Sequence, residues 1–155
     1  MKIKLYLISS LMILSCIACG DSDDESTTMN EMMGTEALAE PDIIGNYVDN
    51  FMTSHVISAS SWTQTYEGGA PSVFHVRKVN NESQFLIAEN DAMNEYNPSL
   101  FSRFDWVTVD DQLWYCQTTF TAESVEDAEA TPAADATDPS MSGCGMYAWS
   151  ALTGQ

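Results

Sequence analysis

The chain has 155 residues, of which 23 are Asp or Glu and only 5 are Lys or Arg, so its formal net charge at pH 7 is −18. A surface of that sign repels phosphates and anionic lipid headgroups, and we therefore expect no nucleic-acid partner. The length suits one domain of ordinary small size.

The N-terminal residues resemble a bacterial lipoprotein signal peptide, which we assign to residues 1–18. Lys2 and Lys4 precede an apolar run over residues 5–14, and small residues then lead to Cys16 and Cys19. The run is too short for a membrane-spanning helix, which needs about 20 apolar residues. The pattern predicts export and a lipid anchor, and an ordinary secretory signal is the alternative.

Two cysteines compete for acylation, because a small residue precedes both Cys16 and Cys19. We favour Cys19, since a polar, acidic segment follows it, whereas acylation at Cys16 would leave apolar Ile17 beside the lipid. No Asp follows Cys19 directly, a pattern that predicts sorting to the outer membrane. The membrane is thus an expected partner, reached through the lipid.

Residues 19–41 are polar and acidic and lack sustained periodicity, so we expect a disordered tether there. The folded domain is then expected over residues 42–155. Without Lys2 and Lys4, the exported chain keeps only Arg77, Lys78 and Arg103 as basic residues against all 23 acids.

Most of the domain has the pattern of β-strands. β-Branched and aromatic residues are dense over residues 55–66, and Trp62, Gln64 and Tyr66 share one face at period two. Two hairpins are predicted by pairs of short apolar runs around turn residues, the first over 73–79 and 84–88, the second over 104–109 and 113–120. An irregular crossover is expected between them, over residues 91–103.

The character changes after Phe120. Residues 121–130 are predicted to form a short helix capped by Thr121, inside an acidic excursion that returns near Gly143. A last strand is expected over residues 146–152. The predicted fold is mainly β, a small antiparallel barrel or sandwich of five to seven strands with a short helical, disulfide-closed acidic flap.

Cys116 and Cys144 remain once the signal region is set aside, and an exported chain reaches an oxidising compartment. We therefore predict a disulfide between them. The loss of chain entropy in the unfolded state implies that this bond stabilises the fold by about 3.6 kcal/mol. A zinc site is disfavoured, because two cysteines without a nearby histidine do not complete one.

Signals of catalysis are weak, and we expect no enzymatic activity. His55 and His75 lie in no metal-binding or Glu-flanked pattern, and the chain has no Gly-x-Ser-x-Gly motif. A hydrolase that uses one of these histidines is the most distant alternative.

No cofactor is required by any motif, although calcium is considered because the chain is rich in oxygen ligands. The candidates are Glu89, Asp91, Asp110 and Asp111. None has the spacing of an EF-hand, and Asx-rich turns more often bind their own backbone.

Four tryptophans fall in the predicted domain: Trp62, Trp106, Trp114 and Trp149. They can fill the core, or they can line the interior of a small barrel that holds one ligand. The second reading predicts a small-molecule carrier.

Two resemblances accompany these patterns. Residues 44–47, Ile-Gly-Asn-Tyr, resemble the Gly-x-Trp opening of lipocalins, with Tyr where Trp is usual. Residues 45–47, 97–106, 114–117 and 133–144 resemble uncharacterised predicted lipoproteins of myxobacteria and related bacteria. The second resemblance implies a lipid anchor and a disulfide, and it carries no assigned activity.

The expected function is that of a membrane-anchored cell-envelope lipoprotein, a non-enzymatic binding or structural surface component with an unknown protein or small-molecule partner. A lipocalin-like carrier is the alternative.

Overall fold

A computed structural model describes residues 38–155. The predicted signal peptide, Cys16, Cys19 and most of the predicted tether lie outside these residues. Among residues 38–155, no helix combines the length and the apolar character that crossing a membrane requires.

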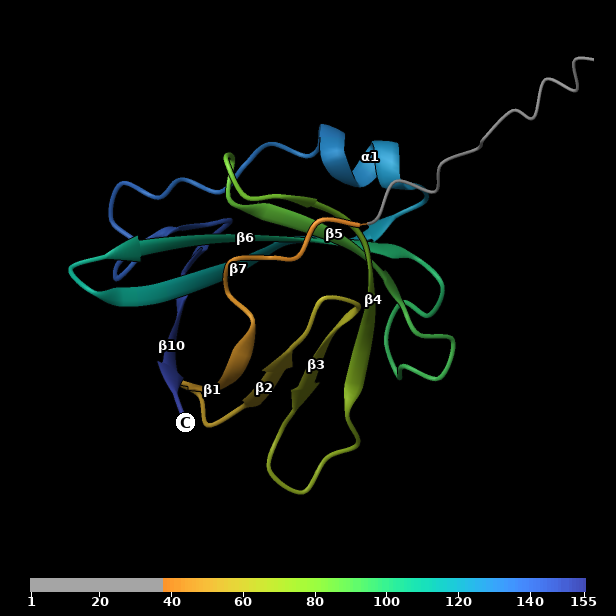
Figure 1. Cartoon of the computed structure of the whole chain (residues 1–155), viewed down its shortest axis with the longest axis horizontal. Coiled ribbons are helices and arrows are strands. Elements are labelled where there is room, and N and C mark those ends of the chain that lie inside the picture. Colours follow the sequence, from red (N-terminus) through yellow and green to blue (C-terminus); the bar gives the residue numbers. More distant parts are fainter. Residues whose placement is uncertain (1–37) are drawn as a thin grey trace, which may run out of the picture. The chain divides into compact units, whose positions relative to one another are not determined.

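Eight antiparallel strands form a closed barrel (Figure 1). Each barrel strand pairs with the next barrel strand along the chain, and the first barrel strand closes the barrel by pairing with the last. The prediction of a mainly β fold is confirmed, and of the two predicted architectures, barrel and sandwich, the barrel is correct. The predicted number of strands, five to seven, is too low. The barrel strands are β1 (Gly45–Asp49), β2 (Ser54–Ile57), β3 (Ser61–Thr65), β4 (Ser72–Asn80), β5 (Phe85–Asn90), β6 (Phe101–Val109), β7 (Gln112–Ala122) and β10 (Ser150–Gly154).

The strand count was wrong because β1 was not expected as a strand and because one predicted strand is in fact two. The run over residues 55–66 reads as one strand, but it forms β2 and β3, joined by a tight turn. In that turn the Ser61 amide donates to Ser58 Oγ over 3.0 Å, and the Ser58 amide donates to the Ser61 carbonyl over 2.8 Å. Serine hydroxyls compete in this way with strand pairing, so they end a strand without Gly or Pro.

The two hairpins predicted from the sequence are confirmed as β4–β5 and β6–β7. In the second, Val109 pairs with Gln112 across a two-residue turn. Asp110 and Asp111 both have positive φ, 50° and 63°. This is the backbone of the type I′ turn that matches strand twist, and Asp tolerates it better than most residues do.

Side chains fill the middle of the barrel. Trp62 stacks on Phe104 with ring centroids 4.6 Å apart, and Phe74 meets Phe104 edge-on at 5.0 Å. Trp106 and Tyr115 belong to the same buried cluster. Because strand side chains alternate between the two faces, one residue in two along β3, β5 and β6 enters this core.

One short helix, α1 (Val125–Ala130), lies against the outside of the barrel (Figure 1). Ser124 caps it, not the predicted Thr121, by accepting from the Asp127 amide. Ala128 packs on Phe85 and Ile87 of β5. The expected helical flap is therefore not confirmed, since apolar burial fixes this helix to the barrel wall.

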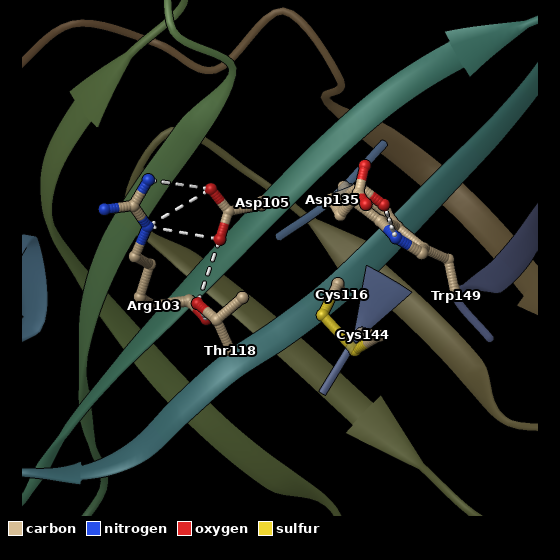
Figure 2. Close-up of a disulfide and its surroundings, with 7 residues drawn as sticks. All are labelled: Arg103, Asp105, Cys116, Thr118, Asp135, Cys144 and Trp149. Carbon is tan, nitrogen blue, oxygen red and sulfur yellow. Dashed lines mark hydrogen bonds and ion pairs between the residues drawn. A yellow bond between two sulfur atoms is a disulfide. The ribbon is translucent and has the colours of Figure 1, made fainter. Parts of the chain in front are cut away.

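Arg103 fastens the end of α1 to β6. Its guanidinium donates to both carboxylate oxygens of Asp105 over 2.8–3.1 Å (Figure 2). Its Nη1 also donates to the carbonyls of Glu129 and Thr131. Thr118 donates to Asp105 from β7 over 2.9 Å. Arg103 and Asp105 are buried, and the cation satisfies carbonyls that the helix end leaves unpaired.

The predicted disulfide between Cys116 and Cys144 is confirmed (Figure 2). It joins β7 to a small separate hairpin of β8 (Gly143–Cys144) and β9 (Tyr147–Ala148). Trp149 then donates from its indole nitrogen to the Asp135 carbonyl over 3.0 Å. At Gly143, with φ +100°, a Cβ atom would lie 1.8 Å from that carbonyl oxygen, so glycine is required there.

Candidate functional site: the barrel mouth

A cavity of about 610 Å³ occupies one end of the barrel, where β3 and β5 end and β4 begins. We call it the mouth cavity. Its volume lies within the range of roughly 300–1,000 Å³ that small-molecule sites occupy. The lining combines amides, aromatic rings, one serine and one carboxylate: Gln64, Tyr66, Ser72, Phe74, Asn90, Asn94, Glu95, Tyr96, Asn97, Gln117 and Phe120.

A chain of hydrogen bonds fixes the floor of this cavity. Gln117 donates from Nε2 to Ser102 Oγ over 2.9 Å, and Ser102 donates onward to Asn90 Oδ1 over 2.6 Å. Asn90 Nδ2 then donates to the carbonyls of Asn97 and Phe120. These bonds orient the Gln117 amide before any ligand arrives, since each partner holds the next.

The connection between β5 and β6 forms one wall, and polar contacts hold it in place. Asn94 accepts from the Val73 amide and donates to the Val73 carbonyl, both over 2.8 Å, as a strand would. Asp91 accepts from the Met93 amide and lies 2.7 Å from His75 Nε2. Both contacts lower the pKa of the Asp91 carboxyl, and the hydrogen bond from the Met93 amide contributes most to that shift. The wall is therefore largely preformed.

Gln64 projects from β3 into the barrel and lines the cavity, yet only 6% of its surface is exposed. Its Nε2 is buried and has no hydrogen-bond partner among the residues that the structure describes. An unpaired buried amide costs about 1–3 kcal/mol, so such groups are rare, and a water or a ligand that accepts from this nitrogen would remove the cost.

Three aromatic rings stand at the rim of the mouth cavity. The exposed fractions of Tyr66, Tyr96 and Phe120 are 59%, 72% and 51%. The neighbouring Glu95 carboxylate raises the pKa of the Tyr96 phenol. Exposed apolar rings gathered around a polar cavity are typical of a recognition surface.

Two further hollows adjoin the mouth cavity. One of about 250 Å³ shares Gln64, Tyr66 and Gln117 with it and adds Phe51 and Tyr147. Another of about 470 Å³ shares Gln117 and Phe120 with the mouth cavity and runs beneath the β8–β9 hairpin. Gln117 lines all three hollows.

The two histidines occupy different places. His55 lies inside the barrel, where its Nδ1 accepts from the Trp62 indole over 3.1 Å and its Nε2 lies 3.2 Å from Asp49. Burial lowers the pKa of His55, although Asp49 opposes that shift. His75 pairs with Asp91 outside the barrel. Neither histidine lines any of the three hollows.

The four tryptophans do not meet at one cavity. Trp62 and Trp106 belong to the solid core, Trp149 is buried under the Asp135 carbonyl, and Trp114 is half-buried on β7. None of them lines the mouth cavity or its two neighbours.

The calcium candidates lie apart, two of them in ion pairs and two in a turn. Glu89 accepts from Arg77, Asp91 is paired with His75, and Asp110 and Asp111 form the β6–β7 turn. Within residues 38–155, no three His, Cys, Asp or Glu side chains lie close enough together to hold a metal ion.

No family model, curated protein or solved structure matches this chain. The geometry of the mouth cavity is therefore the principal guide to function.

Sequence reasoning missed most of this site. The sequence did contain a signal for Gln64. Gln64 and Trp62 are two residues apart on one strand, so they share a face, and the Gln64 amide lies on the face where an apolar residue is expected. Tyr96, Gln117 and Phe120 gave none, since only the closed barrel brings the β5–β6 connection beside β7.

Proposed function

We propose that this protein is a lipid-anchored envelope protein that binds a small ligand at the mouth of its barrel and catalyses no reaction. The observation that carries the proposal is the mouth cavity itself, with its fixed amide floor, its exposed aromatic rim and the unpartnered Gln64 amide. Trp62 and Phe104 fill the middle of the barrel, so the ligand would rest at the mouth. A lipocalin-like carrier, by contrast, would hold its ligand deep inside the barrel.

The proposed anchor and the mouth cavity lie on different sides of the point where the chain enters the barrel. Asn81, in the β4–β5 turn, donates to the Glu40 carbonyl over 2.9 Å and accepts from the Asp42 amide over 3.1 Å. In an antiparallel meander, alternate turns lie at opposite ends, so this turn is at the end opposite the mouth. The chain thus enters the barrel at the end opposite the mouth, and a lipid on its N-terminal side would be attached at that end.

A binding role is also favoured by the chemistry of the lining. Glu95 is the one carboxylate on the three described hollows, and neither a histidine nor a lysine stands beside it as a partner. General acid–base catalysis needs a positioned proton donor and acceptor, which these linings do not pair.

Thermal denaturation of the full chain against a ligand panel tests this function. The panel holds neutral and acidic saccharides, choline, amino acids, fatty acids, haem and calcium. A ligand at 100 times its dissociation constant stabilises by about 2.7 kcal/mol, which raises the midpoint by roughly 10 °C for a domain of this size. We expect Phe120→Ala to abolish that rise and Val56→Ala, an equally exposed position on β2, to retain it. A panel without any mouth-dependent rise refutes the proposal.

The anchor is tested separately by metabolic labelling with a radioactive fatty acid in a bacterial host. Cys19→Ala should lose the label and Cys16→Ala should retain it. The reverse pattern would assign the anchor to Cys16, and label in both variants would refute acylation at a single cysteine.

A further inference from the structure

We infer that the ligand of the mouth cavity is a neutral oligosaccharide, stacked on the rings of Tyr66 and Phe120 and hydrogen-bonded by the amides of Gln64 and Gln117. The inference rests on the proposed function and names the chemical class of its ligand. Four properties of the site lead to it: charge, hydrogen-bonding capacity, ring placement and extent.

Charge excludes anions. No Lys, Arg or His lines any of the three hollows described here, so a phosphate or carboxylate would meet no counter-ion. The net charge of the chain, −18, repels an anion before it arrives. Sugars with carboxylate or sulfate groups are therefore disfavoured, and neutral ones are not.

Hydrogen-bonding capacity excludes an apolar ligand. A fatty acyl chain would leave Gln64 Nε2 buried and unpaired, whereas a hydroxyl oxygen accepts from it. Gln117 uses its Nε2 for Ser102, and its carbonyl oxygen remains outside that chain of bonds, suited to accept from a ligand hydroxyl. A sugar hydroxyl both donates and accepts, so it suits the donor of Gln64 and the free acceptor of Gln117 alike.

Ring placement favours a flat, extended ligand. One face of many pyranoses presents only C–H groups, and such a face packs on an aromatic ring while the hydroxyls at its edge stay polar. The ring pairs in the structure join core side chains, and none joins Tyr66, Tyr96 or Phe120 to another rim residue. Separate rings suit successive sugar units better than a compact cage around a quaternary ammonium.

The extent of the site favours several sugar units. Tyr66 is shared between the mouth cavity and the 250 Å³ hollow, and Phe120 between the mouth cavity and the 470 Å³ hollow. Exposed Phe51 and Tyr147 continue the aromatic surface beyond Tyr66. Three hollows that meet at Gln117 thus offer consecutive subsites along one chain.

Titration calorimetry on the full chain tests this inference, in a polyoxyethylene detergent that carries no sugar headgroup. The probes are the hexasaccharides of glucose in β-1,4 and α-1,4 linkage, of β-1,4-mannose and of N-acetylglucosamine, together with the disaccharide of each. Hexagalacturonate and choline chloride represent acidic and cationic ligands. We expect at least one neutral hexasaccharide to bind, with an affinity at least about tenfold above that of its disaccharide.

Variants assign the binding to the rings. Tyr66→Ala should weaken the neutral hexasaccharide at least about tenfold, whereas Tyr66→Phe, which keeps the ring, should cost less than about threefold. Val56→Ala on the outer face of β2 is the matched control and should leave affinity unchanged. Equal affinity in Tyr66→Ala and the unaltered chain would overturn the inference.

The remaining outcomes separate the ligand class from the proposed function. Mouth-dependent binding of choline or hexagalacturonate without any neutral hexasaccharide overturns the saccharide class and leaves the proposed function standing. Absence of binding by every probe and by the wider ligand panel overturns both.

Discussion

Replacement of Gln64 by methionine should stabilise the protein and weaken ligand binding at the same time. Gln and Met have similar length and volume, so Gln64→Met keeps the packing under the mouth and removes only the amide. Only 6% of the Gln64 surface is exposed, and its Nε2 has no hydrogen-bond partner among residues 38–155.

The magnitude follows from the cost of that unpaired amide. A buried donor without a partner costs about 1–3 kcal/mol, and methionine carries no such cost. A gain of about 1 kcal/mol corresponds to roughly 4 °C in the unfolding midpoint of a domain of this size. The affinity for the mouth ligand should fall in the same variant, because the donor is lost.

The matched control is Gln117→Met, the same chemical change at a partnered amide. It removes the 2.9 Å hydrogen bond to Ser102, so we expect a loss of about 1 kcal/mol. Urea and thermal denaturation of the oxidised protein, followed by circular dichroism, measure both variants. Destabilisation by Gln64→Met equal to that by Gln117→Met would mean that the Gln64 amide is already satisfied, and it would refute the reasoning.

Three further predictions concern the scaffold. Replacing Cys116 and Cys144 together by Ser should cost about 3.6 kcal/mol in urea denaturation, since the two cysteines are 28 positions apart in the sequence, and an unchanged stability would refute that role. Arg103→Met should cost about 3–5 kcal/mol because it leaves the Asp105 carboxylate buried without a counter-ion, and Arg103→Met with Asp105→Leu should recover part of that loss. His55 stays neutral in the fold because burial lowers its pKa, so the unfolded chain binds more protons below pH 6.5 and stability should fall as pH drops from 7 toward the lowered pKa. His55→Gln should flatten that slope by up to about 1.4 kcal/mol per pH unit, and an equal slope in both proteins would contradict the assignment.

The sequence by itself determined the local elements. The hairpin around Asp110 and Asp111 was predictable because turn residues stood between two apolar runs, and the rules for such turns are local. The disulfide was predictable because two cysteines remained in a chain that the sequence predicts to be exported. Serine-rich turns such as residues 58–60 were missed, since a hydroxyl that bonds its own backbone leaves no change in hydropathy.

The tertiary structure alone decided how these elements close and what they bring together. Closure depends on pairs such as Tyr47 with Gly154, whose partners lie at opposite ends of the domain sequence. The same closure sets Gln64, Asn90 and Gln117 around one cavity, although they belong to β3, β5 and β7. Strand alternation is a property of neighbouring residues, but the identity of a site depends on register across a closed sheet, which no short segment specifies.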